Sequence, residues 1–325
     1  VSKETIKKRR TADMANKKTP GVAKKKVNWK TYLRNTWQLY VMMLIPIIWL
    51  ICFKYKPMLY IVVAFKKYNI FKGIWESPWV GFKYFKEAFG SSEFWFAVKN
   101  TLILNIGDLI IGFPFPIFLA LFLNELRSTG VRKMTQIVLY LPNFLSWVII
   151  AGISTQLFSG NGLLNGVLGV FGLPTVPFLT NTIWWRIIYW VMGIWQSAGY
   201  SLIIYLAALM GTDPSQSEAA YLDGATRLQR IWYVTIPQIM PTISTLLIMQ
   251  LGKVINIAFD RPYMMSNMLV KDASNVLSVY VYEVGIGKGR FDYATAVGLF
   301  QSVIGIAMVI IFDKIAKKMG QGGVM

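Results

Sequence analysis

Polar and ionisable side chains recur inside otherwise apolar stretches of this 325-residue chain. Such groups are costly at membrane depth, so they either bind a polar solute or hydrogen-bond a neighbouring helix. Asp108 and Lys253 are full charges that require a cavity or a counter-charge. They either pair with each other across a pathway or face a charged solute. The candidates for solute binding are Asn105, Asp108, Trp147, Gln156, Gln196, Tyr200, Gln250, Lys253, Asn256 and Asp260.

The residue types that carry most enzymatic chemistry are scarce. The chain has no histidine and one cysteine, Cys52, which excludes an internal disulfide and a cysteine-rich metal site. The phosphate-binding pattern G-x-x-x-x-G-K-[ST] is absent, because residues 252–254 and 287–289 do not fit it. No nucleophile is paired with a base. We therefore expect no enzyme, no metal and no cofactor bound by this chain itself.

The composition indicates a membrane protein. Hydrophobic residues make up 55% of the chain, charged residues 15%, and the mean hydropathy is +0.47. The net charge of +19 is concentrated in residues 1–36, a basic tail with few large apolar residues. We expect this tail to be largely disordered or bound to lipid head groups, with no nucleic-acid partner. A signal peptide is the competing interpretation, but its basic region would be very long and no small-residue cleavage site follows.

Apolar stretches of about 20 residues, the length that crosses a bilayer as a helix, recur along the chain. We predict an all-α integral membrane protein with transmembrane helices over residues 37–53, 100–123, 135–158, 183–210, 242–259 and 293–313. The first span either runs on through residues 58–65 or is followed by an interfacial piece. Residues 54–99 form an aromatic belt, a docking surface for an external protein, or both. Residues 159–182 are expected to be an outer loop or a re-entrant turn.

Basic residues set the expected orientation. The tail of residues 1–36 is placed on the cytoplasmic side by the positive-inside rule. Six spans then put segments 124–134, 211–241 and 314–325 on that side as well, so both termini are cytoplasmic. Segment 54–99 holds eight lysines, so the orientation depends on the tail and on span parity.

The polar segment 211–241, between the fourth and fifth spans, carries helix-capping residues. Asp213 can cap a helix that has Pro214 at its first position, and Gly224 suits a left-handed helix end. A second amphipathic helix is expected from Thr226 towards Ile236, with Pro237 and Pro241 marking the boundary before the next span. The segment is therefore predicted to be two rigid helices joined at Gly224.

Residues 218–237 closely resemble the cytoplasmic coupling loop of ABC importer permeases. The matching residues are Glu218, Ala219, Ala220, Gly224 and Pro237, with Val234 and Ile236 as mild departures from the usual pattern. The alternative is an amphipathic surface helix with a chance Glu-Ala-Ala. The resemblance implies a type I importer transmembrane domain whose ATPase docks on this loop. The residues assigned to docking are Glu218, Ala219, Ala220, Asp223, Gly224 and Pro237.

Three further stretches narrow the resemblance to oligo- and polysaccharide permeases, which import alginate, aldouronate and glycan fragments. They are residues 53–68, 139–147 and 293–303. The polar and aromatic candidates suit sugars, because amides and carboxylates pair with hydroxyls and rings cover apolar sugar faces. For Lys253 the two alternatives remain an ion pair with Asp108 and contact with an acidic sugar. A small sugar, a peptide or ion-driven transport are the alternatives.

The family resemblance also implies partners. A second, homologous permease subunit, two cytoplasmic ATPase subunits holding ATP and Mg, and an extracellular or periplasmic solute-binding protein would complete the importer. Membrane lipid would surround the spans. The location implied is a bacterial cell membrane, with this chain as a multi-pass component.

Overall fold

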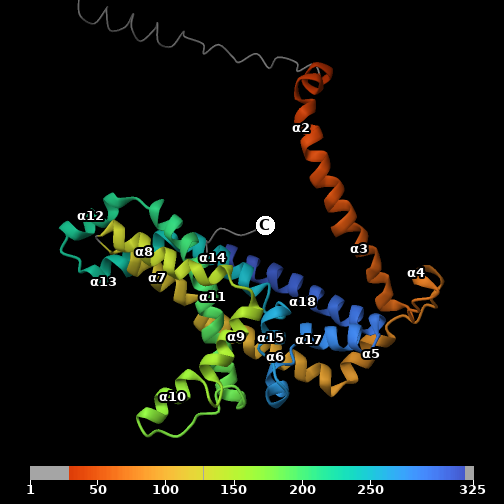
Figure 1. The fold of residues 1–325 in the computed structure, drawn as a ribbon. Coiled ribbons are helices and arrows are strands. Elements are labelled where there is room, and N and C mark those ends of the chain that lie inside the picture. Colours follow the sequence, from red (N-terminus) through yellow and green to blue (C-terminus); the bar gives the residue numbers. More distant parts are fainter. Residues whose placement is uncertain (1–28, 127, 319–325) are drawn as a thin grey trace, which may run out of the picture. The chain divides into compact units, whose positions relative to one another are not determined.

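The computed structural model describes residues 29–126 and 128–318, which are almost entirely helical (Figure 1). The chain divides into two compact units, Val1–Tyr60 and Ile61–Met325. Six helical stretches are long and apolar enough to cross a membrane. The predicted all-α architecture with six spans is thus confirmed.

The described residues of the first unit, 29–60, are helical throughout. The unit contains α2 (Trp29–Leu50), η1 (Ile51–Tyr55) and α3 (Lys56–Met58), and the span itself runs over Thr36–Phe65 through η2 (Leu59–Phe65). The first span therefore runs on past residue 53. Of the predicted tail, residues 29–36 are helical, and residues 1–28 lie outside the described part of the chain.

The second unit is organised around one long helix, α11 (Thr182–Met210). It contacts α6 (Ser92–Gly107), η3 (Asp108–Gly112) and α7 (Pro114–Asn124), which together form the second span. It also contacts α8 (Thr129–Tyr140), α9 (Trp147–Phe158) and α14 (Ile236–Leu251). Large side chains of α11 are fully enclosed among these neighbours, namely Trp185, Tyr189, Leu202 and Tyr205. The last span, α18 (Phe291–Lys318), packs on α14 and on α5 (Lys83–Gly90).

Two predicted spans are wrong as continuous helices. Residues 135–158 are divided among α8, η4 (Leu141–Phe144) and α9, because Ser146 begins a new helix by accepting a hydrogen bond from the Ile149 amide. The fifth span stops at Leu251 instead of residue 259.

The segments between the spans contain short helices. Residues 252–290 hold several of them, and residues 159–182 contain the short helix α10 (Leu163–Val170). The short helices are α15 (Asp260–Met264), η6 (Met268–Val270), α16 (Lys271–Ser274), α17 (Leu277–Tyr282) and η7 (Glu283–Gly287).

Three prolines inside spans follow π turns. The π turn η1 directly precedes the pair Lys56-Pro57, η3 lies two residues before Pro114, and η5 (Ile231–Thr235) lies two residues before Pro237. Proline lacks an N–H and its ring crowds the preceding turn, and a wider turn relieves both problems. The predicted boundary at Pro237 and Pro241 is therefore wrong, because the helix runs unbroken over Arg227–Leu251.

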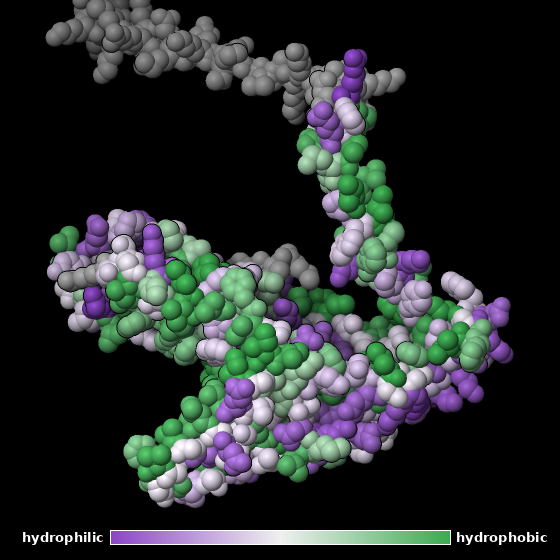
Figure 2. Space-filling model, viewed as in Figure 1, coloured by the Kyte–Doolittle hydropathy of each residue, from purple (hydrophilic) through white to green (hydrophobic). Residues whose placement is uncertain are grey.

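Hydrophilic side chains gather at the two ends of the second unit (Figure 2). One group lies over α12 (Pro214–Leu222) and α13 (Arg227–Arg230), and the other lies over α5, α6 and α17. Apolar side chains dominate the surface between them. This distribution is the one expected of a bundle whose middle lies in hydrocarbon.

The contact of α11 with α8 depends on the absence of a side chain at Gly199. A Cβ built there would overlap the backbone carbonyl of Leu139. We predict that Gly199→Ala lowers the free energy of unfolding by about 1–3 kcal/mol, as overpacking does, and lowers the thermal unfolding midpoint in detergent. Gly298→Ala is the matched control, because a Cβ there meets nothing within 4 Å. Equal midpoints for the two variants would contradict this account.

Candidate functional site

The coupling loop contains the two helices expected from its capping residues. Asp213 caps α12 by accepting a hydrogen bond from the Ser215 amide at 3.0 Å. Hydrogen bonds from Ser215 hold the pKa of Asp213 below its ordinary value, so the cap stays ionised at neutral pH. Gly224 ends the first helix with a φ of +82°. Thr226 and Gln229 form a capping box that starts α13.

The loop is tied to the spans by specific polar contacts. Gln238, in α14 of the fifth span, accepts from the Asp213 amide at 3.1 Å and donates to Gln216 at 3.0 Å. Arg227 pairs at 2.9 Å with Glu125, the residue that follows α7. The two loop helices are also held together, since the Arg230 guanidinium lies 5.2 Å from the centre of the Tyr221 ring. The coupling loop is therefore attached to both the second and the fifth span.

The outward surface of the loop presents both the motif residues and large apolar side chains. Glu218, Ala219, Asp223, Gly224 and Pro237 are exposed, and Ala220 is half-buried. The sequence analysis did not single out the exposed apolar residues among them, which are Tyr221, Leu222, Leu228, Trp232 and Tyr233. Apolar side chains gathered in a polar loop indicate a protein-binding surface. Beside them lies an open depression of about 380 Å³ lined by Ala220, Gly224 and Tyr233.

Asp108 pairs with Arg261 and not with Lys253. The Asp108 carboxylate accepts two hydrogen bonds from the guanidinium, at 2.7 and 3.1 Å. Arg261 also donates to the Tyr189 carbonyl at 2.7 Å and lies 3.6 Å from the centre of the Tyr189 ring. Both charged side chains are less than one-fifth exposed. The two-pronged geometry requires arginine, because a lysine presents a single ammonium group.

A polar cavity of about 260 Å³ opens beside this ion pair. Gln250 is the other pathway candidate that lines it, together with hydroxyl-bearing residues of α11. Gly193 is required at its wall, because a Cβ there would overlap the Arg261 guanidinium. The polar lining residues are Asp108, Ser197, Ser201, Tyr205, Gln250 and Arg261. The cavity thus offers a carboxylate, a guanidinium, an amide and hydroxyls to a solute.

The remaining candidates are dispersed. Asn105 donates to the backbone carbonyls of Lys253 and Val254, at 3.2 and 2.7 Å, and so holds the broken end of the fifth span. Trp147 lies against Arg261 with its ring centre 5.4 Å from the guanidinium carbon. Of the others, Gln196 is half-buried and the exposed ones are Gln156, Tyr200, Lys253, Asn256 and Asp260. The structure does not bring these residues together around the cavity.

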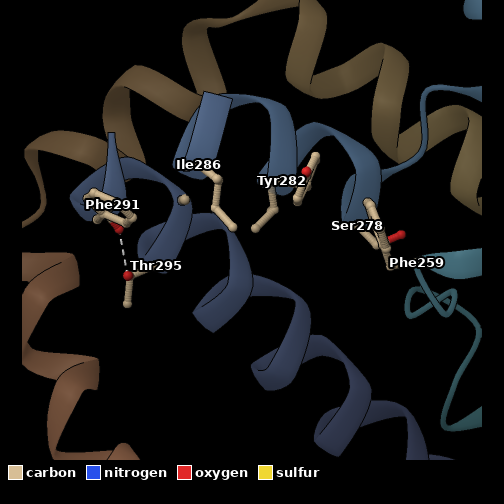
Figure 3. Close-up of a pocket in the computed structure, with 9 residues that line it drawn as sticks. Phe259, Ser278, Tyr282, Ile286, Phe291 and Thr295 are labelled. Carbon is tan, nitrogen blue, oxygen red and sulfur yellow. Dashed lines mark hydrogen bonds between the residues drawn. The ribbon is translucent and has the colours of Figure 1, made fainter. Parts of the chain in front are cut away.

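An aromatic cluster that the sequence analysis missed follows the fifth span. Phe259 stacks on Tyr263 with ring centres 4.5 Å apart, and Tyr282 lies 4.7 Å from Phe259. Figure 3 shows Phe259, Tyr282 and Phe291 around a groove of about 380 Å³ between α17 and α18. Over residues 29–126 and 128–318 no cluster of three or more histidine, cysteine or carboxylate side chains could hold a metal.

Six apolar helices, a charged cavity in the second unit and an exposed loop anchored to two spans define a membrane transport subunit. Residues 112–321 match the family described as binding-protein-dependent transport system inner membrane component, and the chain belongs to this family. It is a permease of an ABC importer and has a transport role, not an enzymatic one.

The chain is similar to several transport proteins over most of its length. The chain is 37% identical to protein LplB of Bacillus subtilis (strain 168), over 98% of this chain and 99% of that protein. It is 41% identical to the polygalacturonan/rhamnogalacturonan transport system permease protein YteP of the same organism, over 88% and 89% of the two chains. The crystal structure of a bacterial alginate ABC transporter, in complex with an alginate pentasaccharide-bound periplasmic protein, contains a chain that is 39% identical. It covers 91% of this chain and 99% of that one, with a TM-score of 0.83.

Neutralising Asp108 should destabilise the bundle. Asp108→Asn leaves the Arg261 guanidinium without its counter-charge, and breaking a buried pair in this way costs about 3–5 kcal/mol. We expect a clear fall in the thermal unfolding midpoint of the detergent-solubilised protein. Asp260→Asn is the control, because Asp260 is exposed and its loss should change stability by less than about 0.5 kcal/mol. An unchanged midpoint for Asp108→Asn would refute a stabilising role for the pair.

Proposed function

We propose that this permease forms the transmembrane pathway for an oligosaccharide or polysaccharide fragment delivered by an external solute-binding protein. The observation that carries the proposal is the 41% identity to a permease named for polygalacturonan and rhamnogalacturonan. The likeness to an alginate transporter over 91% of the chain supports it. The cavity beside Asp108 supports it chemically, since sugar hydroxyls both donate and accept hydrogen bonds.

Within this pathway we assign the solute contacts to the cavity beside Asp108. Gln250 and the serine hydroxyls of α11 line it and are free to exchange partners with a sugar. Asp108 and Arg261 form its wall while they remain paired. Trp147 and the aromatic groove of Figure 3 offer flat apolar surfaces on which sugar rings stack. The exposed candidates, such as Gln156 and Tyr200, would meet the solute only where the partner permease completes the pathway.

The coupling loop is proposed to dock a separate ATPase subunit, where ATP and Mg are bound. Glu218 offers an exposed carboxylate, and Leu222 and Tyr233 offer apolar contacts that are 84% and 80% exposed. Because the loop is attached to the second span through Arg227 and Glu125, movement of the ATPase would shift the spans directly. Two ATPases and a second homologous permease complete the proposed assembly. Both termini lie on the cytoplasmic side of a bacterial cell membrane.

Removing the Glu218 carboxylate should uncouple the importer. We predict that Glu218→Ala reduces solute uptake at least tenfold, because a charged hydrogen-bonding contact at an interface contributes about 1.5–3 kcal/mol. The same variant should retain less ATPase on purification. Glu76→Ala serves as the control, since Glu76 is an exposed acid in the helix α4 (Gly73–Glu76), outside the coupling loop. Full uptake by Glu218→Ala would contradict docking at this position.

The substrate class is tested by ATP hydrolysis. The complete importer, reconstituted in liposomes with its own binding protein, should hydrolyse ATP faster when supplied with oligosaccharides than with amino acids or short peptides. Oligosaccharides should also be the solutes that accumulate inside the liposomes. Stimulation and uptake confined to peptides would reject the proposed function and leave the family assignment unaffected.

A further inference from the structure

A second polar cavity, of about 570 Å³, lies in the second unit where α6 and α11 begin. Side chains from α16, α17 and η7 complete its lining. Its lining residues are different from those of the cavity beside Asp108. It lies among the elements whose side chains make this end of the unit hydrophilic (Figure 2). In the proposed orientation this is the outer end of the pathway, which a delivered solute reaches first.

Arg186 is an uncompensated cation in this cavity. Its side chain is half-buried, and its Nη2 donates a long hydrogen bond, at 3.4 Å, to the amide oxygen of Asn100. Its Nε is buried and has no acceptor among the described residues, and no carboxylate there pairs with the guanidinium. A guanidinium removed from water without a counter-charge is costly. A carboxylate ligand would satisfy Nε and a terminal nitrogen together, which is the preferred geometry of that pair.

Asn275 lines the same cavity and needs a hydrogen-bond donor, whereas Arg186 needs an acceptor. Its side-chain oxygen is buried and receives no hydrogen bond from any residue that the structure describes. Its backbone is held firmly, because Asn100 donates to the carbonyls of Asp272 and Asn275, at 2.6 and 3.2 Å. An unpaired buried acceptor needs a donor, and a ligand hydroxyl is such a group. The cavity therefore suits a ligand that carries both a carboxylate and a hydroxyl group.

The other charges of the lining refine this requirement. Lys99 and Lys288 line the cavity without an ion-pair partner in the described ranges, whereas Lys271 is neutralised by Glu283 at 3.0 Å. Glu93 and Asp272 also line it. These carboxylates disfavour a dense polyanion and provide further acceptors for hydroxyls. The balance of charges suits a ligand with one carboxylate and several hydroxyl groups.

We propose that this cavity binds a uronate unit, a sugar ring bearing a carboxylate, of an acidic oligosaccharide. Arg186 binds the carboxylate, Asn275 accepts a hydrogen bond from a ring hydroxyl, and the exposed Phe96 ring at the cavity offers an apolar surface to the sugar. The inference rests on the proposed function and sharpens it, because it makes acidic glycans the preferred solutes of the importer.

The test compares an acidic sugar with its uncharged methyl ester, which keeps the same sugar rings and ring hydroxyls. Galacturonate trisaccharide and its methyl ester are supplied to the complete importer in liposomes, together with its own binding protein. A neutral glucose trisaccharide is the third solute. We expect Arg186→Gln to raise the half-saturating concentration of the acid roughly tenfold or more, the size of a lost charged hydrogen bond, and to leave uptake of the ester unchanged. Arg186→Lys should restore part of the preference for the acid over the ester, because it restores the positive charge.

Lys314→Gln is the control, since it removes an exposed lysine outside the cavity and outside segment 54–99, and it should leave all three sugars unaffected. Size-exclusion chromatography of each variant confirms that the complex is assembled. Unchanged uptake of the acid by Arg186→Gln would overturn the inference. Equal losses for acid and ester, with weaker stimulation by the sugar-free binding protein, would also overturn it and assign the cavity to protein docking.

The same measurement separates this inference from the proposed function. Uptake of the glucose trisaccharide alone, with no uptake of the acid by the unaltered importer, would overturn the uronate site and support sugar import. No uptake of any of the three sugars, together with uptake of peptides, would overturn both.

Discussion

The pairing of Asp108 with Arg261 is the interaction on which the arrangement of the spans depends. It joins the second span to the segment that follows the broken fifth span, and the guanidinium rests on α11 through Tyr189. Neither charge would be stable alone at this depth, so each fixes the other. Gly193 is needed because the guanidinium lies directly against the α11 backbone. One ion pair thus sets the packing of three elements and forms the wall of a cavity.

The break in the fifth span after Leu251 also involves a polar residue of the second span. Asn105, one turn before Asp108, donates to the carbonyls of Lys253 and Val254, just beyond the end of the helix. The Lys253 carbonyl also accepts from the Asn256 amide at 2.8 Å. These contacts hold the chain where it leaves the helix inside the bundle. Elsewhere, π turns before Pro114 and Pro237 keep spans helical.

The polar groups of the bundle have two different roles. Asp108 and Arg261 pair with each other, and Asn105 donates to the carbonyls of Lys253 and Val254, so these groups hold the structure while the cavity beside Asp108 remains open to a solute. Arg186 lacks a carboxylate partner among the described residues, and the side-chain oxygen of Asn275 receives no hydrogen bond there. Paired groups contribute to stability, whereas unsatisfied buried groups are costly unless a ligand pairs with them.

The sequence by itself determined the membrane class, six spans, and the coupling loop down to its caps at Asp213 and Gly224. Those features depend on composition and on contacts within a few residues, which adjacent positions specify. Only the tertiary structure decided that Asp108 pairs with Arg261, 153 residues away, and that Arg186 lacks a counter-charge. Which charged side chains pair depends on which helix faces pack together. The sequence around each charge does not specify that packing. The break after Leu251 was missed for the same reason, because Asn105 contacts it from another helix.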